Sequence, residues 1–424
     1  MKKALPFLLI LLLLTGCATK KDTTDFKSYS AINAMIKEKD FFTARDAYNA
    51  DKKKIAEPYS LILEAGLDNA FNRLEASNEK IDKVFKQYSD KVTDTVKLEL
   101  LEIEQGNYGK LFEYKKASEV VTTMLQKYSA LMTKDIEDDH RNTLIIWEAL
   151  ADQPKQEVIV KETTTIKMIR DKAQLTNLKV DQGDIAIDFI FDTGANFSTV
   201  TKTTAQKLNM KMLNGTIKVD AITGIVINSQ LAICPEFTIG DIIVKNAVFL
   251  VFPDEALSFP QADYQINGII GYPVIEALKE IQITLSDEFI VPKHPTPYNQ
   301  QNMALDFLNP VIDLNGEYYT FDSGAVGTML YTKYVDKYRD KIVGKYKEEN
   351  MEYGGAVGSL TKKGYVITFS TTINNKPVTV DEVQAFNEKI SEKENHFYGN
   401  IGQDIIRQFN KMTMNFESMY IKFD

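Results

Sequence analysis

Two short segments of this chain repeat each other, and this repeat constrains the fold more than any other feature of the sequence. Segment 191–195 reads FDTGA, and segment 321–325 reads FDSGA. A glycine preceded by isoleucine follows each aspartate at nearly the same distance, with 271 − 192 = 79 and 402 − 322 = 80. A second glycine lies 32 residues after each aspartate, at positions 224 and 354. Three landmarks at matched spacing predict two copies of one folding unit in a single chain.

Residues 31–154 have the apolar periodicity of amphipathic helices. One stripe at helical spacing consists of Leu63, Leu67, Ala70, Phe71 and Leu74. Segment 39–41 is loosely repeated at 106–108, and the separation (108 − 41 = 67) is close to two periods of a helical hairpin of about 34 residues. These features resemble a divergent tetratricopeptide-type array. Such a domain could dock a protein partner or act as a spacer, and the sequence leaves both open.

From residue 155 the chain becomes rich in strand-forming residues. Short apolar runs such as 185–191 and 248–252 alternate with Gly, Asn and Asp turns, which is typical of β structure. Three prolines within residues 292–297 predict a stiff, extended linker over 293–297. The β-rich part is therefore expected to consist of two lobes, 155–292 and 298–424.

The amino terminus has the pattern of a secretory signal peptide. Two lysines precede an apolar run that ends in Leu-Thr-Gly-Cys at residues 14–17, and the run is shorter than the roughly 20 residues that span a bilayer. This pattern resembles the bacterial lipoprotein lipobox. The resemblance implies that residues 1–16 are removed, that Cys17 carries palmitate and other lipid, and that 17–30 is the tether. An ordinary secreted protein cut near this point is the alternative.

The lipobox resemblance predicts a membrane-anchored protein of the bacterial cell envelope, in the outer membrane, with the periplasmic or surface face left open. Removing Lys2 and Lys3 with the signal peptide takes the formal charge from −9 to −11. Such a negative charge argues against nucleic acid as a partner.

The order of motifs in the two repeated units resembles one lobe of an aspartic peptidase of the retropepsin and pepsin type. In that family an aspartate lies on a tight loop, a glycine-bearing hairpin forms a flap over the substrate, and a late glycine lets a strand pass behind the loop. The resemblance implies a multidomain α + β protein, with a helical, repeat-like domain followed by a bilobal all-β peptidase fold. Both lobes lie in one chain, as in pepsins, but they are short, as in retropepsins.

The resemblance also assigns roles to individual residues. The two catalytic carboxylates would be Asp192 and Asp322. The residues expected to support the active-site loops are Thr193, Gly194, Ala195, Ser323, Gly324, Ala325, Gly271 and Gly402. The residues expected in the substrate flaps are Gly224, Gly354 and Gly355. The substrate would be an extended peptide or protein, hydrolysed by a water that the aspartate pair activates.

Other reactive residues indicate no second chemistry. Cys234 lies in an apolar run and is expected to be a buried, inert thiol. The histidines, His140, His294 and His396, have no metal-ligand spacing, so we expect neither a metal site nor a cofactor. Two functions compete with catalysis: a non-catalytic module that binds peptides in the cleft, and a structural scaffold of the cell envelope. The presence of both aspartates favours catalysis.

Overall fold

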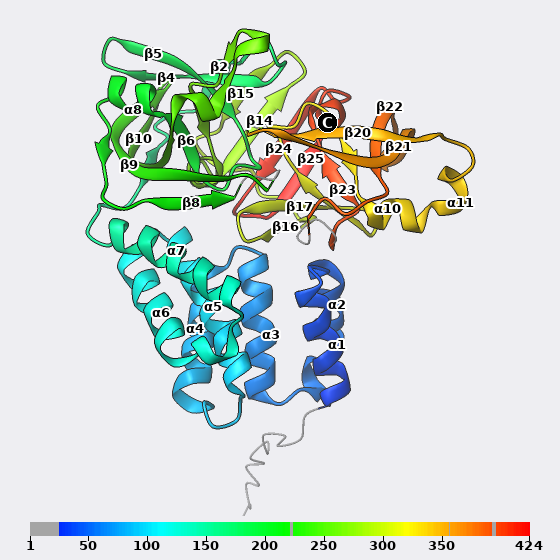
Figure 1. The fold of residues 1–424 in the computed structure, drawn as a ribbon. Coiled ribbons are helices and arrows are strands. Elements are labelled where there is room, and N and C mark those ends of the chain that lie inside the picture. Colours follow the sequence, from blue (N-terminus) through cyan, green and yellow to red (C-terminus); the bar gives the residue numbers. More distant parts are fainter. Residues whose placement is uncertain (1–24, 221–223, 356, 392–395) are drawn as a thin grey trace, which may run out of the picture.

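The computed structural model describes residues 25–220, 224–355, 357–391 and 396–424 (Figure 1). Helices come first in the chain, and a β-rich part with several sheets follows. The predicted signal peptide, Cys17 and the first part of the tether lie outside the described residues. Within the described ranges, we find no helix with the length and apolar character needed to cross a bilayer.

The helical region is a series of antiparallel hairpins. Its helices are α1 (Phe26–Lys37), α2 (Phe41–Asp51), α3 (Glu57–Ala70), α4 (Leu74–Gln87), α5 (Asp94–Lys110), α6 (Tyr114–Lys127) and α7 (Lys134–Leu150). Lys39, Asn72 and Phe112 adopt positive φ at the turns that follow α1, α3 and α5. The hydroxyls of Thr93 and Thr133 cap α5 and α7 by accepting hydrogen bonds from backbone N–H groups of their first turns.

Three details of the helical region differ from the sequence-based expectation. The first helix begins at Phe26, so the last part of the predicted tether, 26–30, is helical because Asp25 caps it. The predicted stripe from Leu63 to Leu74 spans two helices, since Asn72 turns the chain between them. The segments 39–41 and 106–108 are not equivalent, because the first joins α1 to α2 and the second lies inside α5.

The first β-rich half, residues 157–291, is built on a ten-stranded sheet. Its elements are β1 (Glu157–Ile159), β2 (Thr164–Lys167), β3 (Ile169–Arg170), β4 (Thr176–Gln182), β5 (Ile185–Phe191), β6 (Ser198–Thr201), α8 (Lys202–Lys207), β7 (Lys211–Met212), β8 (Ile217–Asp220), β9 (Val226–Ile239), β10 (Ile242–Phe252), β11 (Ser258–Phe259), β12 (Tyr264–Gln265), β13 (Gly268–Ile270), α9 (Tyr272–Ala277), β14 (Glu280–Thr284) and β15 (Glu288–Val291). Strand β13 lies between β5 and β6, parallel to β5 and antiparallel to β6.

The second half, residues 303–423, repeats this arrangement around an eight-stranded sheet. Its elements are β16 (Met303–Asp306), β17 (Asn309–Leu314), β18 (Glu317–Phe321), β19 (Met329–Leu330), α10 (Thr332–Lys337), α11 (Arg339–Ile342), β20 (Glu348–Gly354), β21 (Ser359–Ile373), β22 (Lys376–Phe386), β23 (Gly399–Ile401), α12 (Gln403–Ile406), β24 (Lys411–Asn415) and β25 (Tyr420–Phe423). Strand β23 lies parallel to β18 and antiparallel to β19, as β13 does to β5 and β6. The two halves also contain the short helices α8 to α12, so this region of the chain is β-rich rather than all-β as expected.

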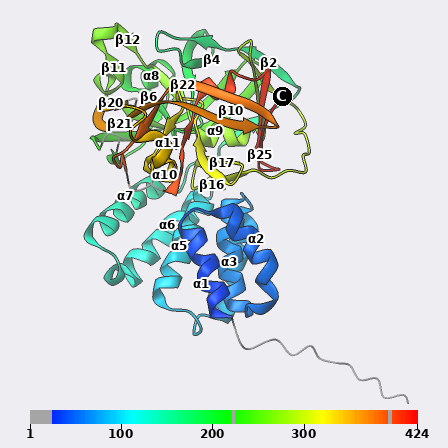
Figure 2. The same ribbon diagram turned by 90° about the vertical axis from the view of Figure 1, so that its right-hand side faces the viewer.

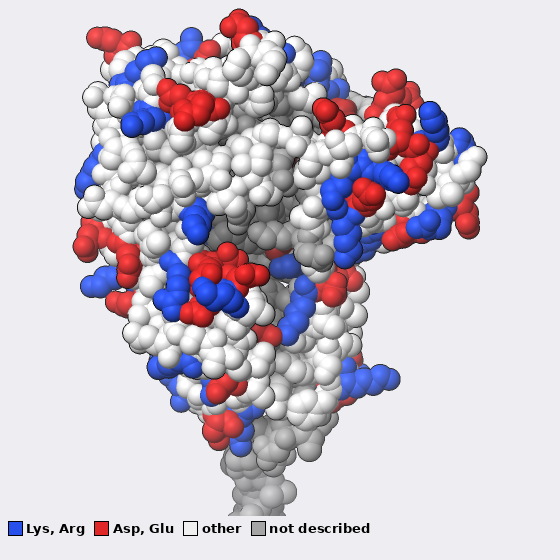
Figure 3. Space-filling model, viewed as in Figure 1, with Lys and Arg blue, Asp and Glu red and all other residues white. Residues whose placement is uncertain are grey.

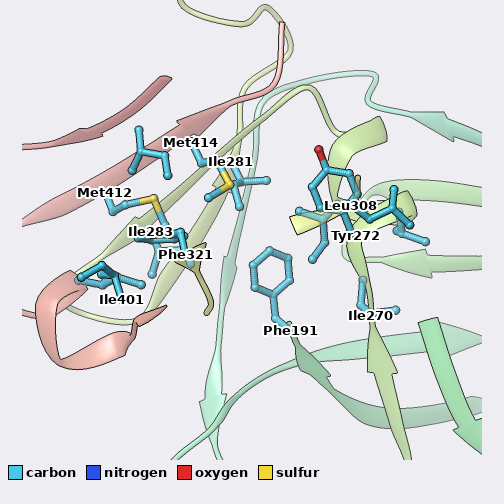
Figure 4. Packing of buried hydrophobic residues seen from close by; sticks show 14 of the residues in the cluster. Phe191, Ile270, Tyr272, Ile281, Ile283, Leu308, Phe321, Ile401, Met412 and Met414 are labelled. Atoms are coloured by element: carbon cyan, nitrogen blue, oxygen red, sulfur yellow. The ribbon is translucent and has the colours of Figure 1, made fainter. Parts of the chain in front are cut away.

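A five-stranded sheet joins the two halves. Its strand order is β2-β15-β14-β24-β25, so the hairpin β14–β15 of the first half pairs with the hairpin β24–β25 of the second. The buried side chains on this sheet form one core with both halves. Figure 4 shows Phe191 and Ile270 of the first half and Phe321 and Ile401 of the second in this core, together with Met414 of β24. The halves are thus continuous by both backbone pairing and side-chain packing.

The linker that connects the halves is fixed to the shared sheet. Glu280 of β14 is fully buried, and its carboxylate accepts a 2.6 Å hydrogen bond from the backbone N–H of Thr296 and a 2.8 Å bond from the side-chain amide of Asn415. A buried carboxylate that receives such bonds keeps the proline-rich segment in place.

The helical region contacts both β-rich halves (Figures 1 and 2). Helices α1 to α3 share a hydrophobic cluster with the second half, and helices α5 to α7 share another with the first half. At the first contact, Lys39 forms a 2.7 Å ion pair with Asp306, and the hydroxyls of Thr43 and Tyr318 are 2.9 Å apart. The helical region therefore packs as an integral part of the molecule.

The contact with the first half contains a buried ion pair. Lys110 of α5 has a side chain only 2% exposed, and its Nζ lies 3.5 Å from Oε1 of Glu276 on α9. Burial lowers the pKa of Lys110, while Glu276 opposes that shift. The side-chain oxygen of Asn72 accepts a further bond from Lys110 (2.8 Å).

Figure 3 shows that acidic and basic side chains are interspersed on the face of the molecule seen in this view.

Candidate active site

The two predicted loops meet at the centre of the β-rich part and are bonded to each other. The backbone N–H of Thr193 donates to Oγ of Ser323 (3.1 Å), and the backbone N–H of Ser323 donates to Oγ1 of Thr193 (2.9 Å). Each hydroxyl also donates across the interface, Thr193 to the carbonyl of Phe321 (3.3 Å) and Ser323 to that of Phe191 (3.1 Å). Thr193 and Ser323 are 0% and 1% exposed. This symmetric network fixes the distance between the two loops.

The carboxyl groups of Asp192 and Asp322 face each other across this network. A methyl group added at Gly194 would lie 2.7 Å from Cγ of Asp322, and one added at Gly324 would lie closer still to the carboxyl of Asp192. Each glycine is therefore in contact with the aspartate of the other loop. Neither glycine has a positive φ, so close approach, rather than backbone conformation, excludes a side chain at both positions.

Each aspartate is oriented by the backbone of its own loop. Oδ1 of Asp192 accepts from the N–H groups of Gly194 (2.8 Å) and Ala195 (3.1 Å). Oδ1 of Asp322 accepts from the N–H of Gly324 (2.7 Å). Burial nevertheless raises the pKa of both carboxyl groups, and for Asp192 the neighbouring charge of Asp322 adds to the effect. The pair therefore holds a proton more tightly than isolated aspartates do.

The two loops differ at one position beside the carboxyl groups. The first half has Ile269 where the second half has Asn400, since these residues occupy equivalent places in β13 and β23. A hydrogen bond from Asn400 opposes the rise in the pKa of Asp322, and so does the hydrogen bond to Asp192. The pKa of Asp192 lies well above its ordinary value, because burial and the charge of Asp322 raise it together. Both carboxyl groups titrate as one pair, and the pair retains a proton above the ordinary pKa of an aspartate.

Gly271 and Gly402 lie directly behind the loops. A methyl group at Gly271 would lie 2.6 Å from the backbone of Phe197, and one at Gly402 would lie 2.7 Å from the backbone of Gly327. The residue after each glycine donates its N–H to the active loop: Tyr272 to the carbonyl of Ala195 (2.8 Å), and Gln403 to the carbonyl of Ala325 (2.9 Å).

The sequence analysis missed two supporting hydroxyls. Oγ of Ser198 accepts from the N–H of Gly271 (3.0 Å), and Oγ1 of Thr328 accepts from the N–H of Gly402 (3.2 Å). Both residues lie six positions after their aspartate (198 − 192 and 328 − 322). A fourth pair of landmarks in the same repeat would have revealed them.

Two hairpins carry the predicted flap glycines. In the first hairpin, β8–β9, Gly224 lies in the turn with φ +78, and residues 221–223 of that turn are outside the described ranges. In the second hairpin, β20–β21, Gly354 ends β20 and Gly355 lies in the turn. Val357 of that turn packs against the hydrophobic cluster of the first half and helices α5 to α7. The second hairpin therefore extends over the space between the halves.

A cavity of about 890 Å³ adjoins Asp192 and the loop residues Gly324 and Ala325, and it extends beneath the second hairpin. The first half lines it with mainly apolar side chains: Leu175, Ile190, Phe259, Ile266 and Ile269. The second half adds acidic side chains that do not belong to the pair: Glu352, Asp381, Glu382 and Asp404. Among these, Asp404 is held by the N–H (2.8 Å) and hydroxyl (2.6 Å) of Thr328. The other three give this side of the cavity a negative potential.

The remaining reactive residues lie apart from the aspartate pair. Cys234 is buried, as predicted, and burial raises the pKa of its thiol to about 12. In the described part of the chain, no three His, Cys, Asp or Glu side chains are grouped so that they could hold a metal ion.

Comparison with known families agrees with the geometry of the first half. The model of the aspartyl protease family matches residues 176–274, a stretch that contains Asp192, Gly224 and Gly271. No curated protein matches the chain. The family match supports an aspartyl protease domain in this part of the chain, and with it a hydrolase that acts on peptide bonds.

Proposed function

We propose that this protein is an aspartic endopeptidase whose two lobes, 155–292 and 298–424, form one active site from Asp192 and Asp322. The observation that carries the proposal is the reciprocal bonding of the loops through Thr193 and Ser323, with the two carboxyl groups facing each other beside a cavity. Two close carboxyl groups do not both ionise readily, so they share a proton and titrate as a unit.

Such a pair performs both proton transfers of peptide hydrolysis. The ionised carboxylate of the pair removes a proton from a water molecule, and the water oxygen bonds to the carbonyl carbon of the substrate. The protonated carboxyl of the pair donates its proton to the carbonyl oxygen. When the tetrahedral intermediate collapses, the carbon–nitrogen bond breaks and the leaving nitrogen receives a proton from the pair. The products are a carboxylic acid and an amine, and no oxidant or reductant takes part.

The lining of the cavity favours a particular kind of peptide. Its size and the hairpin above it suit an extended chain, whose backbone the flap glycines allow to approach closely. The apolar side chains of the first half favour a bulky apolar residue in the substrate. Glu352, Asp381 and Glu382 of the second half favour a lysine or arginine in the part of the substrate that they face.

A peptide library tests the proposal directly. The protein is incubated with the library, and the products are identified by mass spectrometry. We expect internal cleavage, with apolar and basic residues enriched around the cut bond. The matched control is the protein with both Asp192→Asn and Asp322→Asn. Equal cleavage by this control would assign the activity to a contaminant and refute the proposal.

The raised pKa values lead to a prediction about pH. The active form of the pair carries one proton. Activity therefore falls at the pH where this remaining proton dissociates. Because burial raises the pKa of both carboxyl groups, and Ala195 and Ala325 provide no side-chain hydroxyl, activity should extend to weakly acidic and near-neutral pH. Asn400→Ile removes a bond that lowers the pKa of Asp322 and should move the acidic limb upward. A profile of kcat/KM confined to strongly acidic pH would contradict this.

We also propose that lipid on Cys17 anchors the peptidase to a membrane of the bacterial cell envelope. The basis is the apolar run that ends in Leu-Thr-Gly-Cys at residues 14–17. Cys17→Ser should move the protein from the membrane to the soluble fraction or leave its precursor uncut. Mass spectrometry that finds Cys17 unmodified in the mature protein would exclude the anchor.

A further inference from the structure

The helical region is bonded to the first hairpin through one side chain. Asn142 of α7 donates from Nδ2 to the carbonyl of Lys218 on β8 (2.8 Å), and its Oδ1 accepts from the N–H of the same residue (2.9 Å). The side-chain amide thus bonds both backbone groups of Lys218. A neighbouring strand would bond the N–H and the carbonyl of a strand residue in the same way.

Strand β8 is an edge strand of its hairpin, because it pairs with β9 on one side only. The backbone groups of Lys218 point to the other side, where Asn142 lies. An unpaired edge residue would otherwise bond to water and leave the strand free to move. Helix α7 therefore covers this edge at the position where the hairpin begins.

Apolar packing supports the same contact. Ile217 of β8 is 2% exposed and lies in one hydrophobic cluster with Trp147 and Leu150 of α7. A side-chain carbon of Ile145 lies 3.0 Å from the position that a methyl group would take on Gly215, just before the hairpin. Bonds and packing together connect the base of the first hairpin to the helical region.

The second hairpin has a different environment. In Figure 1 the strands β20 and β21 lie on the side away from α7, and they extend from the body of the molecule with α10 and α11. Strand β20 ends at Gly354, which lines the cavity. The two hairpins occupy corresponding places in the two halves. Among the described residues, the hydrogen bonds of Asn142 reach the first hairpin, whereas Val357 of the second hairpin packs against the cluster of the first half and α5 to α7.

We propose that Asn142 is a positioning residue of the peptidase: its two hydrogen bonds to Lys218 hold strand β8 in place, so that substrate binding need not order the base of the first hairpin. The inference rests on the proposed function, since it treats the hairpin as a flap. In a protein whose binding-competent state is only partly populated, the apparent dissociation constant rises in proportion to the lost population. The helical region would then contribute to substrate affinity without contacting the substrate.

The test compares Asn142→Ala with Asn142→Asp in the full chain. Asp keeps the acceptor for the N–H of Lys218 and loses the donor, whereas Ala loses both. With a peptide that the library identifies, Asn142→Ala should raise KM about threefold to tenfold and leave kcat unchanged, because two hydrogen bonds of ordinary strength are lost. The KM of Asn142→Asp should lie between that of Asn142→Ala and that of the natural protein. Asp139→Ala, at an exposed position of the same helix, is the control and should change neither constant.

Hydrogen exchange of the Lys218 amide gives a readout that does not require activity. We expect this amide to be protected in the natural protein, protected in Asn142→Asp and fast in Asn142→Ala. An unprotected amide in the natural protein would overturn the contact itself. Fast exchange in Asn142→Ala with an unchanged KM would overturn the positioning role while the peptidase proposal stands. If exchange follows the expected order and no peptide is cleaved, the proposed function fails and the contact remains.

Discussion

Replacing Asp192 or Asp322 with Asn is expected to reduce turnover by about 10²-fold to 10⁴-fold or more, the range that acid–base groups contribute. Asparagine has nearly the shape of aspartic acid and keeps the acceptor for the loop N–H groups, so the loops should stay in place. It can neither remove a proton from water nor donate one to the carbonyl oxygen. The double variant should be little worse than either single variant, because residues that act as one unit lose their function together.

The same variants should not lose stability, and the sign follows from the pKa shifts. Both carboxyl groups have a raised pKa in the folded protein, so folding favours their protonated forms. The stability that this provides is fully present below the pKa of the unfolded chain, about 3.9, and is lost as pH rises through the folded pKa values. Asparagine is neutral throughout. At neutral pH we therefore expect a Tm equal to or above that of the natural protein.

Mixing the two single variants tests whether the site lies within one chain. If Asp192 and Asp322 of one chain form the pair, a mixture of Asp192→Asn and Asp322→Asn contains no complete pair and stays inactive. A dimer that combined halves of different chains would regain activity by complementation. Regained activity would therefore refute the intrachain site, and full activity of Asp322→Asn alone would refute the role of the second half.

The candidate site was largely predictable because its geometry restricts the residue types. Each loop lies against the carboxyl group of the other, which requires Gly194 and Gly324, and a strand that passes behind each loop requires Gly271 and Gly402. These restrictions leave a pattern of fixed residues at fixed spacing. The same pattern predicted two β-rich units, and the structure contains two sheets with matching strand orders around the loops.

The contacts of the helical region with the β-rich part were not predictable, because they use side chains of ordinary types. Asn142 is one polar residue on a polar stretch of helix, and its bonds to Lys218 depend on the relative position of two segments about 76 residues apart. The loose match of 39–41 to 106–108 did not identify equivalent positions of a helical repeat, since a chance similarity of three residues carries little information about where helices end. The helices share hydrophobic clusters with both halves, so they pack directly on the β-rich part.

Replacing Gly324 with Ala is expected to abolish most activity through steric contact alone. The added methyl group would overlap the carboxyl group of Asp192, and the equivalent group on Gly194 would lie 2.7 Å from Asp322. Neither loop can move away from the other without breaking the hydrogen bonds between Thr193 and Ser323. Overpacking of this kind costs about 1–3 kcal/mol, so we expect a lower Tm as well as displaced carboxyl groups.

The control for this prediction is Gly354→Ala in the second hairpin. The nearest atoms to a methyl group there lie 3.7 Å away, an ordinary van der Waals distance, and Gly354 has no positive φ. This variant should keep its Tm, and kcat should change far less than in Gly324→Ala. The measurement is kcat with thermal unfolding for Gly194→Ala, Gly324→Ala and Gly354→Ala in parallel. If Gly324→Ala retained the activity of the natural protein, the two carboxyl groups could not lie as close as the shared-proton mechanism requires, and that mechanism would have to be abandoned.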